Sequence, residues 1–253
     1  MRRKAASSAV VGAVLVLFFL AGCSSSSQKA GGADATTQAT RQAYAPRIDP
    51  ADFTTKVDNQ YFPLKPGTTL LYRGKTKDGT QGDVMTVTHH TKRIMGVACV
   101  VVDDEVTEGG GKPVERTLDW YAQDKGGNVW YFGEDTKEYE NGKVKSTAGS
   151  WEAGKDGAEP GIIMPARPKV GQSYRQEYYE GKAEDMARVV DLNGSAKVPY
   201  GSFERVLVTE EWTPLEPGVA ARKYYAAGVG DIMEVGVKGP PETLQLVGVK
   251  STG

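Results

Sequence analysis

The fold of this chain is decided by the stretch Trp120-Tyr121-Ala122-Gln123-Asp124-Lys125-Gly126-Gly127-Asn128-Val129-Trp130-Tyr131-Phe132. Two aromatic-rich runs flank a turn of Asp, Gly and Asn, which is the composition that a β-hairpin requires. Successive side chains of a strand point to opposite faces. We therefore expect one member of each aromatic pair to enter the core and the other to cap a surface.

The strand pattern continues on both sides of this hairpin, with almost no helical periodicity. Strands are expected at 70–73, 84–89, 97–102, 116–121, 129–132, 186–192, 203–209, 222–226 and 232–237. These runs are short, rich in Val, Thr, Tyr and Trp, and separated by Gly, Asp, Asn and Lys. The strongest hairpin signal is Asn141-Gly142, because a type I′ turn needs positive φ at both central residues. The sequence predicts an all-β protein.

Landmarks recur in the same order at a spacing of about 104 residues. Tyr72-Arg73 matches Tyr174-Arg175, Gly96 matches Gly201, and Trp120 matches Tyr224. Such periodicity predicts two repeated units, at 61–134 and 163–237, joined by a hairpin-containing linker. Each would be an antiparallel meander with one apolar face that it cannot bury alone. If the two units pack as one sandwich or barrel-like body, each buries the apolar face of the other, and fewer strand edges are exposed.

The N-terminus has the layout of an export signal. Arg2, Arg3 and Lys4 precede an apolar run at 9–20, whose length suits a cleavable signal better than a spanning helix. The string Leu20-Ala21-Gly22-Cys23 resembles a bacterial lipobox, which implies a signal peptide at 1–22 and a lipidated Cys23. We expect the mature protein to be anchored to the cell membrane on its extracytoplasmic face by more than one acyl chain.

The segment that follows Cys23 has almost no bulky apolar side chains. Its Ser, Gly, Ala, Thr and Gln cannot bury enough surface to offset the entropy of ordering, so residues 23–47 are expected to form a flexible tether to a body at 48–249. Without the signal, 28 basic and 32 acidic side chains remain, a formal charge of −4. No basic stripe is present, which argues against a nucleic-acid partner.

Two motifs carry a family resemblance. The segment 119–134, with Trp120-Tyr121-Ala122 and then GNVWYFGE at 127–134, is similar to a motif of uncharacterised exported β-rich proteins and lipoproteins of bacteria, especially actinobacteria. The pair VPYGSF at 198–203 and YYAAGVG at 224–230 resembles a second motif of the same proteins, as does Pro160-Gly161-Ile162-Ile163-Met164-Pro165. The resemblance implies a fold type and a cell-envelope setting, and it transfers no catalytic residue.

The candidate binding surface consists of aromatic and apolar residues. Exposed rings offer large contact areas with a polar handle, and consecutive apolar residues in a Pro/Gly-bounded linker suggest a lid or contact patch. The residues are Trp120, Tyr121, Trp130, Tyr131, Ile162, Ile163 and Met164. Hairpin and core packing explain the aromatic residues without any ligand, and this is the favoured interpretation for them. A lipophilic molecule, a glycan or an envelope protein would be the partner.

Metal and thiol chemistry have little support. His89 and His90 are adjacent, so on a strand they point to opposite faces, and a soft copper site with Met85 and Cys99 would need a strand pair to converge. Cys99 lies in an apolar run, where a thiol is a small buried hydrophobe. We expect no metal site and no cofactor.

Enzymatic signatures are also weak. No Gly-x-Ser-x-Gly elbow occurs. Acidic runs at 103–105 and 177–185 could supply paired carboxylates for a hydrolase, although acidic residues in β proteins more often protect sheet edges. The sequence therefore predicts an extracytoplasmic binding or scaffolding protein, with a hydrolase as the alternative.

Overall fold

The computed structural model describes residues 44–76 and 79–252. The expected signal peptide, the lipidated Cys23 and most of the tether lie outside these residues. No helix among the described residues is long and apolar enough to cross a membrane. The described residues are all-β apart from the 3-10 turn η1 (Pro50–Asp52), which confirms the predicted fold class.

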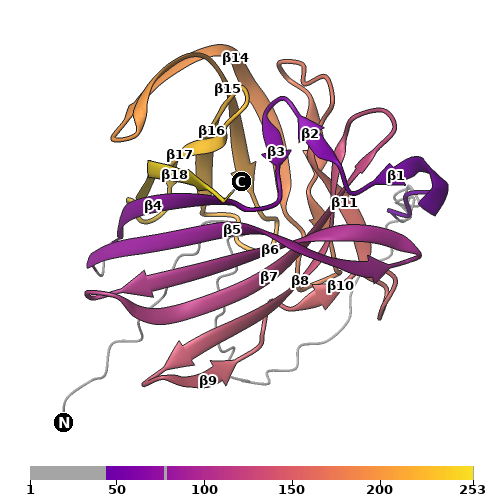
Figure 1. Ribbon diagram of the computed structural model, residues 1–253, viewed down its shortest axis with the longest axis horizontal. Helices are drawn as coiled ribbons and strands as arrows, with labels where there is room; N and C mark the ends of the chain where they lie inside the picture. The colour runs from indigo at the N-terminus through magenta and orange to yellow at the C-terminus, as the bar shows by residue number, and fades with distance from the viewer. Residues whose placement is uncertain (1–43, 77–78, 253) are drawn as a thin grey trace, which may run out of the picture.

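The first half of the body is an antiparallel meander of five long strands (Figure 1). The strands are β4 (Thr68–Thr76), β5 (Gly79–Ile94), β6 (Val97–Glu108), β7 (Lys112–Asp124) and β8 (Val129–Glu140). Asn141 and Gly142 have φ of 54° and 74° and join β8 to β9 (Lys143–Ser146), with Glu140 opposite Lys143. The hairpin expected at Asn141-Gly142 is thereby confirmed.

The second half is also a meander. It consists of β14 (Met186–Val198), β15 (Gly201–Trp212), β16 (Ala220–Ala226), β17 (Gly230–Lys238) and β18 (Thr243–Ser251). β18 falls outside the strands expected from the sequence pattern, and it pairs with β4, so it joins the two meanders into one sheet. The division of the chain into two repeats stays a prediction.

A short two-part strand closes the sheet on itself. β12 (Ser173–Arg175) pairs with β14, and β13 (Glu177–Tyr178), one residue further on, pairs with β11 (Glu159–Met164), which in turn pairs with β8. The segment 173–178 thus connects the two ends of the sheet, and the body is a barrel-like sheet rather than a two-sheet sandwich.

Backbones approach closely at this seam. A Cβ on Gly161 would collide with the backbone of Gln176 and Glu177, so only glycine fits where β11 meets the bend between β12 and β13. Gly133, with φ of 122°, has a similar role in β8, where a Cβ would collide with the carbonyl of Trp151 in β10 (Trp151–Glu152). These glycines let short strands lie directly against the barrel wall.

Two hairpins extend across the interior. The first is β2 (Val57–Asn59) with β3 (Phe62–Leu64), which follows β1 (Phe53–Thr54). The side chain of Gln123 accepts hydrogen bonds from the backbone N–H groups of Asp58 and Asn59 at 3.0 and 2.9 Å, while Gly228 donates to the carbonyl of Gln60 at 2.8 Å. This hairpin therefore bridges β7 and the β16–β17 turn.

The second is the long β14–β15 hairpin, which arches over the barrel (Figure 1). Tyr200, in its turn, donates a backbone hydrogen bond to the carbonyl of Leu246 at 3.1 Å. Its Val198 and Val206 belong to one apolar cluster with Leu70 and Tyr72 of β4. The remaining interior, between this cluster and the main core, contains polar side chains.

Candidate functional site

Carboxyl groups line the inside of the barrel. On β7 the alternation of side chains turns Glu115, Thr117 and Asp119 inward, with relative exposures of 7%, 3% and 1%. Arg116, between them, is exposed. Adjacent strands continue the row, and we define the inner acidic cluster as Asp83, Asp104, Glu115, Asp119, Glu134 and Glu177, all of which are buried.

The acids of β5 and β6 face one another. Asp83 is paired in register with Val106, and Met85 with Asp104, so the two carboxyls are diagonal neighbours on the inner face, each 2% exposed. Burial raises the pKa of Asp104 well above its usual value, and the nearby charge of Asp83 adds to the effect. Two carboxyls held this close together resist ionising at the same time.

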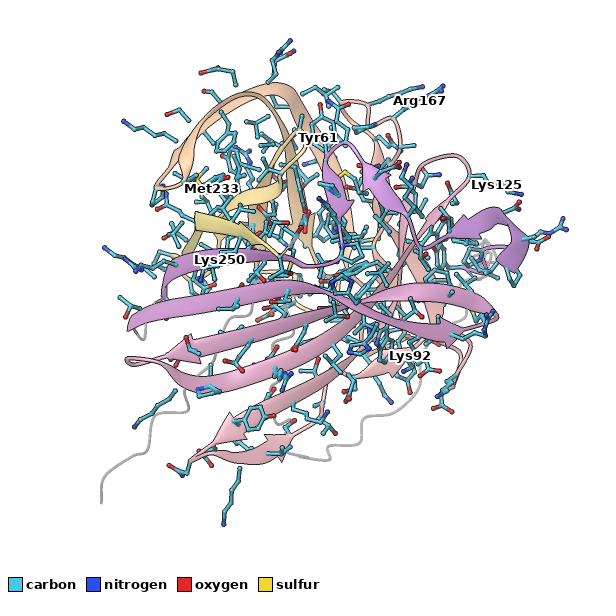
Figure 2. All side chains as sticks on the ribbon, in the orientation of Figure 1. Tyr61, Lys92, Lys125, Arg167, Met233 and Lys250 are labelled. Carbon is cyan, nitrogen blue, oxygen red and sulfur yellow. The ribbon has the colours of Figure 1, made fainter. Side chains whose placement is uncertain are left out.

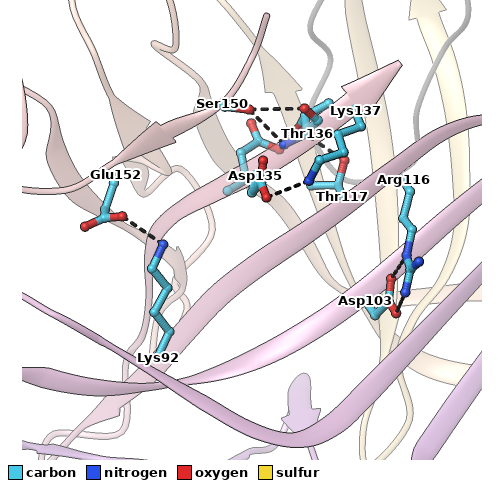
Figure 3. Close-up of polar contacts among 10 residues, drawn as sticks. Lys92, Asp103, Arg116, Thr117, Asp135, Thr136, Lys137, Ser150 and Glu152 are labelled. Carbon is cyan, nitrogen blue, oxygen red and sulfur yellow. Dashed lines mark hydrogen bonds and ion pairs between the residues drawn. The ribbon is translucent and has the colours of Figure 1, made fainter. Parts of the chain in front are cut away.

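Two threonines connect the acids of β7 and β8 (Figure 3). Thr117 donates to Glu115 at 3.0 Å, Thr136 donates to Glu134 at 3.0 Å, and the two hydroxyl oxygens lie 3.2 Å apart. Two hydroxyl protons cannot supply three hydrogen bonds. Burial raises the pKa of Glu115 to about 8 and that of Glu134 well above its usual value, which favours a proton on one carboxyl of this chain of groups.

The remaining acids approach from the same side of the barrel. Asp119 accepts a hydrogen bond from the hydroxyl of Tyr131 at 2.6 Å. Glu177 is fully buried on β13, and burial raises its pKa well above the usual value, with the charges of Asp185 and Glu134 adding to the effect.

The opposite wall carries one inward cation. Lys223 of β16 lies 3.3 Å from Glu211 and 3.8 Å from Glu234, and its side chain is only 13% exposed. Burial alone would lower the pKa of Lys223, but the surrounding carboxylates outweigh it and raise the pKa above its usual value. The Lys223 charge also acts across the interior, because it lowers the pKa of both Asp104 and Asp119.

Burial sets the protonation state of the cluster. It raises the pKa of Asp83 to about 7 and those of Glu115 and Asp119 to about 8. Neighbouring negative charges add to the shift at each of these groups, whereas hydrogen bonds from Thr117 and Tyr131 oppose it. The cluster therefore exchanges protons near neutral pH, which ordinary carboxyls do not.

Several buried polar atoms of the interior have no hydrogen-bond partner among the described residues. Neither oxygen of Asp104 has a donor, and the hydroxyl of Tyr174 and Nε2 of Gln176 are also unpartnered. Tyr174 faces the Lys223 side, since Glu211 raises its pKa and Lys223 lowers it. Most buried polar groups in folded proteins have partners. The described residues therefore leave part of the hydrogen-bonding capacity of the interior unused.

The aromatic residues expected to form a contact surface belong to the core. Trp120 and Tyr121 are each 5% exposed, and Tyr131 is 0% exposed. Tyr121 and Tyr131 stack inside the barrel with centroids 4.8 Å apart, as expected for one face of the hairpin. The other face is covered as well: Lys92 lies 3.2 Å from the centroid of the Trp120 ring and pairs with Glu152 (Figure 3).

Trp130 and the apolar segment at 162–164 are likewise parts of the wall. Trp130 is half-buried, packs against Phe53 with centroids 6.1 Å apart, and donates its indole N–H to Asp124 at 2.8 Å. Ile162, Ile163 and Met164 are in strand β11, which pairs with β8, and not in a loop. Met164 is 0% and Ile163 8% exposed, so the expected lid is a strand of the barrel.

The side chains considered for metal chemistry do not converge. His89 and His90 are exposed, whereas Cys99 is buried, and burial raises the pKa of its thiol to about 12. Among the described residues, no group of three or more His, Cys, Asp or Glu side chains is arranged to hold a metal ion. The chemistry that the interior can offer is hydrogen bonding, proton exchange and attraction of positive charge.

Sequence reasoning assigned the acidic runs at 103–105 and 177–185 to solvated edges, and this is wrong for Asp104 and Glu177. The signal that could have found them is alternation: Glu115-x-Thr117-x-Asp119 places polar residues on one face of a strand that is apolar further along. A polar interior face becomes recognisable only once the sheet is known to close around it.

Comparison with known proteins gives two solved structures. The chain is similar to an inferred exported protein with a YmcC-like fold from Bacteroides fragilis NCTC 9343, at 14% identity and a TM-score of 0.46, over 76% of this chain and 100% of that one. It is also similar to an inferred lipoprotein from Parabacteroides distasonis ATCC 8503, at 12% identity and a TM-score of 0.42, over 76% and 99% of the two chains. No family model and no curated protein matches the chain. The motif resemblance to exported actinobacterial proteins stays a prediction.

Proposed function

We propose that this chain is a lipid-anchored extracytoplasmic protein that acts by binding, and that its ligand occupies the inside of the barrel. The signal and lipobox of residues 1–23 support the location. The observation that carries the binding role is the set of buried, unpartnered polar atoms, including both oxygens of Asp104 and the hydroxyl of Tyr174. An unsatisfied buried polar group costs about 1–3 kcal/mol, so a bound molecule that supplies partners is stabilising.

This proposal replaces the surface expected from the sequence. Trp120, Tyr121 and Met164 are at most 5% exposed, so they do not form a contact surface on the outside of the barrel. The interior has instead the mixture of a few polar groups among apolar and aromatic walls that small-molecule sites share. The ligand class therefore shifts from a lipophilic molecule, glycan or protein to a small polar molecule.

Native mass spectrometry of the full chain, extracted from bacterial membranes in mild detergent, tests the binding role. We expect a mass above that of the acylated protein that disappears on denaturation. The variant Asp104→Asn should reduce this adduct, whereas Asp103→Asn, which changes the neighbouring outward side chain, should retain it. A wild-type protein with no adduct under gentle extraction would contradict binding.

A hydrolase is the second candidate, and the Asp83–Asp104 pair favours it. Two neighbouring buried carboxyls with raised pKa values can supply an acid and a base together, as hydrolysis of a glycosidic bond requires. Assays with chromogenic aryl glycosides separate this candidate from pure binding. Turnover that Asp83→Asn abolishes and Asp103→Asn retains would establish a hydrolase, and absence of turnover leaves the binding role in place.

A further inference from the structure

The barrel interior has an excess of acid that the chain does not balance. None of the described residues on the inner faces of β5–β8 is Lys or Arg, whereas Asp83, Asp104 and Asp119 all point inward there. Lys223, on the opposite wall, is already within 3.8 Å of both Glu211 and Glu234. On the outside, Lys125, Arg167 and Lys250 extend away from the barrel (Figure 2).

A second observation, independent of the acids, also points to a ligand. The hydroxyl of Tyr174 is buried without a partner, the side chain is 9% exposed, and it faces the interior near Lys223. Nε2 of Gln176, 4% exposed on the same seam segment, is likewise unpartnered. Because nearly all buried polar groups in folded proteins have a hydrogen-bond partner, these two groups point to a polar occupant.

Aromatic rings lie among the carboxyls. Tyr72 is the register partner of Asp83, Tyr121 follows Asp119 by two residues on the inner face of β7, and the hydroxyl of Tyr225 donates to Glu211 at 3.1 Å. Carboxylates and the faces of aromatic rings both attract ammonium groups. A divalent metal ion fits less well, because the described acids form no compact ligand group.

We propose that the barrel interior binds a linear aliphatic polyamine, whose ammonium groups take the inner acidic cluster as their partners. The extent of the cluster argues for several charges on one chain rather than a single amine. It runs along β7 from Glu115 to Asp119, includes Asp104 on one neighbouring strand and Glu134 on the other, and reaches Glu177 at the seam. The methylene segments between ammonium groups suit the apolar side chains of the same wall, such as Val102 and Val106.

Exposure increases along this row toward one end of the barrel. Asp119 is 1% exposed, Glu115 is 7% exposed, and Glu138, the register partner of Glu115 on β8, is partly exposed. The acidic row therefore begins at the surface near the β6–β7 turn and continues inward. A flexible cation can enter from this end with a carboxylate partner at each step.

This inference rests on the proposed binding function, and spermidine is the probe that tests it. Thermal unfolding of the full chain in detergent is followed at pH 8 against increasing spermidine, at constant ionic strength. We expect a saturable rise in Tm, because a ligand that binds only the folded state stabilises it. The uncharged chain 1,8-octanediol and the divalent ion Mg²⁺ should give no comparable rise.

Matched variants locate the site. Asp104→Asn should weaken spermidine binding at least about tenfold, because a buried carboxyl that can release its proton and pair with an ammonium group is lost, while Asp103→Asn should bind as the wild type does. Tyr174→Phe, which removes only a hydroxyl, should weaken binding by a smaller factor. If Asp104→Asn does not fold, spermidine binding by Glu177→Gln and Tyr174→Phe is compared with that by Asp103→Asn instead.

The outcomes separate the two proposals. An unsaturable response to spermidine, an equal response to octanediol or Mg²⁺, or equal loss in Asp103→Asn and Asp104→Asn would overturn the polyamine assignment. If spermidine has no effect but native mass spectrometry shows a non-cationic small molecule that depends on Asp104, the polyamine assignment fails and the binding function remains. If neither experiment shows a ligand, both fail.

Discussion

Asp103 and Asp104 are neighbours in the sequence, and the barrel wall separates their side chains completely. Asp103 accepts two hydrogen bonds from the guanidinium of Arg116 at 2.8 and 2.6 Å on the outside (Figure 3). Asp104 is 2% exposed inside the barrel, and neither of its oxygens has a hydrogen-bond partner among the described residues. Two aspartate side chains one residue apart thus have opposite environments. A substitution at Asp103 is therefore a matched control for the same substitution at Asp104.

Asp104→Asn should stabilise the protein when no ligand is bound. The amide carries no charge to desolvate, and its NH2 group can donate to Asp83, so we expect the free energy of unfolding to rise by roughly 1–3 kcal/mol. Asp103→Asn should lower it by less than about 1 kcal/mol, because the Arg116 side chain is half exposed. Urea unfolding at pH 8 measures both, and a destabilised Asp104→Asn would show that its charge has a partner.

Stability should fall as pH rises from 5 to 9. Asp83, Glu115 and Asp119 have pKa values of about 7, 8 and 8 in the fold but about 4 when unfolded, so the folded state holds more protons in between. The contribution of these groups to the free energy of unfolding is fully present below about pH 4 and is lost as the pH rises through 7–8.

Urea unfolding at several pH values tests this dependence. The carboxyl groups that face the three acids are Asp104, Glu134, Glu138, Glu177, Asp231 and Glu234, and Lys223 stays charged over this pH range. Asp104→Asn should flatten the curve, because removing one charge reduces the shifts of its neighbours. A stability that is constant or increases between pH 5 and 9 would be incompatible with a protonated interior.

Local sequence signals predicted the strands and not what covers them. The Asn141-Gly142 turn follows from backbone conformation alone and occurs as expected. The Trp120-Tyr121 pair also alternates as expected, yet both rings are buried, since Lys92 covers Trp120 on the outer face of β7 and Tyr121 stacks on Tyr131 inside. Coverage by residues distant in the sequence has no local signal.

Recognising the candidate site from the sequence would also have required knowing that the sheet closes into a barrel. The segment at 162–164 has the composition of a loop bounded by Pro and Gly, and it is a strand because Gly161 allows β11 to approach the seam. Polar residues such as Asp104 look like surface residues in an antiparallel strand until the opposite wall is in place. Closure, which turns an exposed face into an interior, cannot be read from one strand.

Cys23→Ala should release the protein from the membrane fraction or leave an uncleaved precursor. Both acylation and lipoprotein-type cleavage depend on the thiol that follows Leu20-Ala21-Gly22. Fractionation with an antibody against the body, compared with a Ser24→Ala control, measures the effect. Normal processing and unchanged membrane retention of Cys23→Ala would exclude the lipobox.

Replacing Ile162, Ile163 and Met164 together by Ser should unfold the barrel rather than weaken a surface contact. Met164 is 0% and Ile163 8% exposed in β11, and large-to-small changes at such positions cost roughly 2–5 kcal/mol each. The single change Ile162→Ser, at the half-buried position, is the matched control and should cost clearly less. Circular dichroism melts measure the difference. A triple variant that melts near the wild-type temperature would contradict the burial of this segment in the wall and would support the exposed contact patch that its sequence suggested.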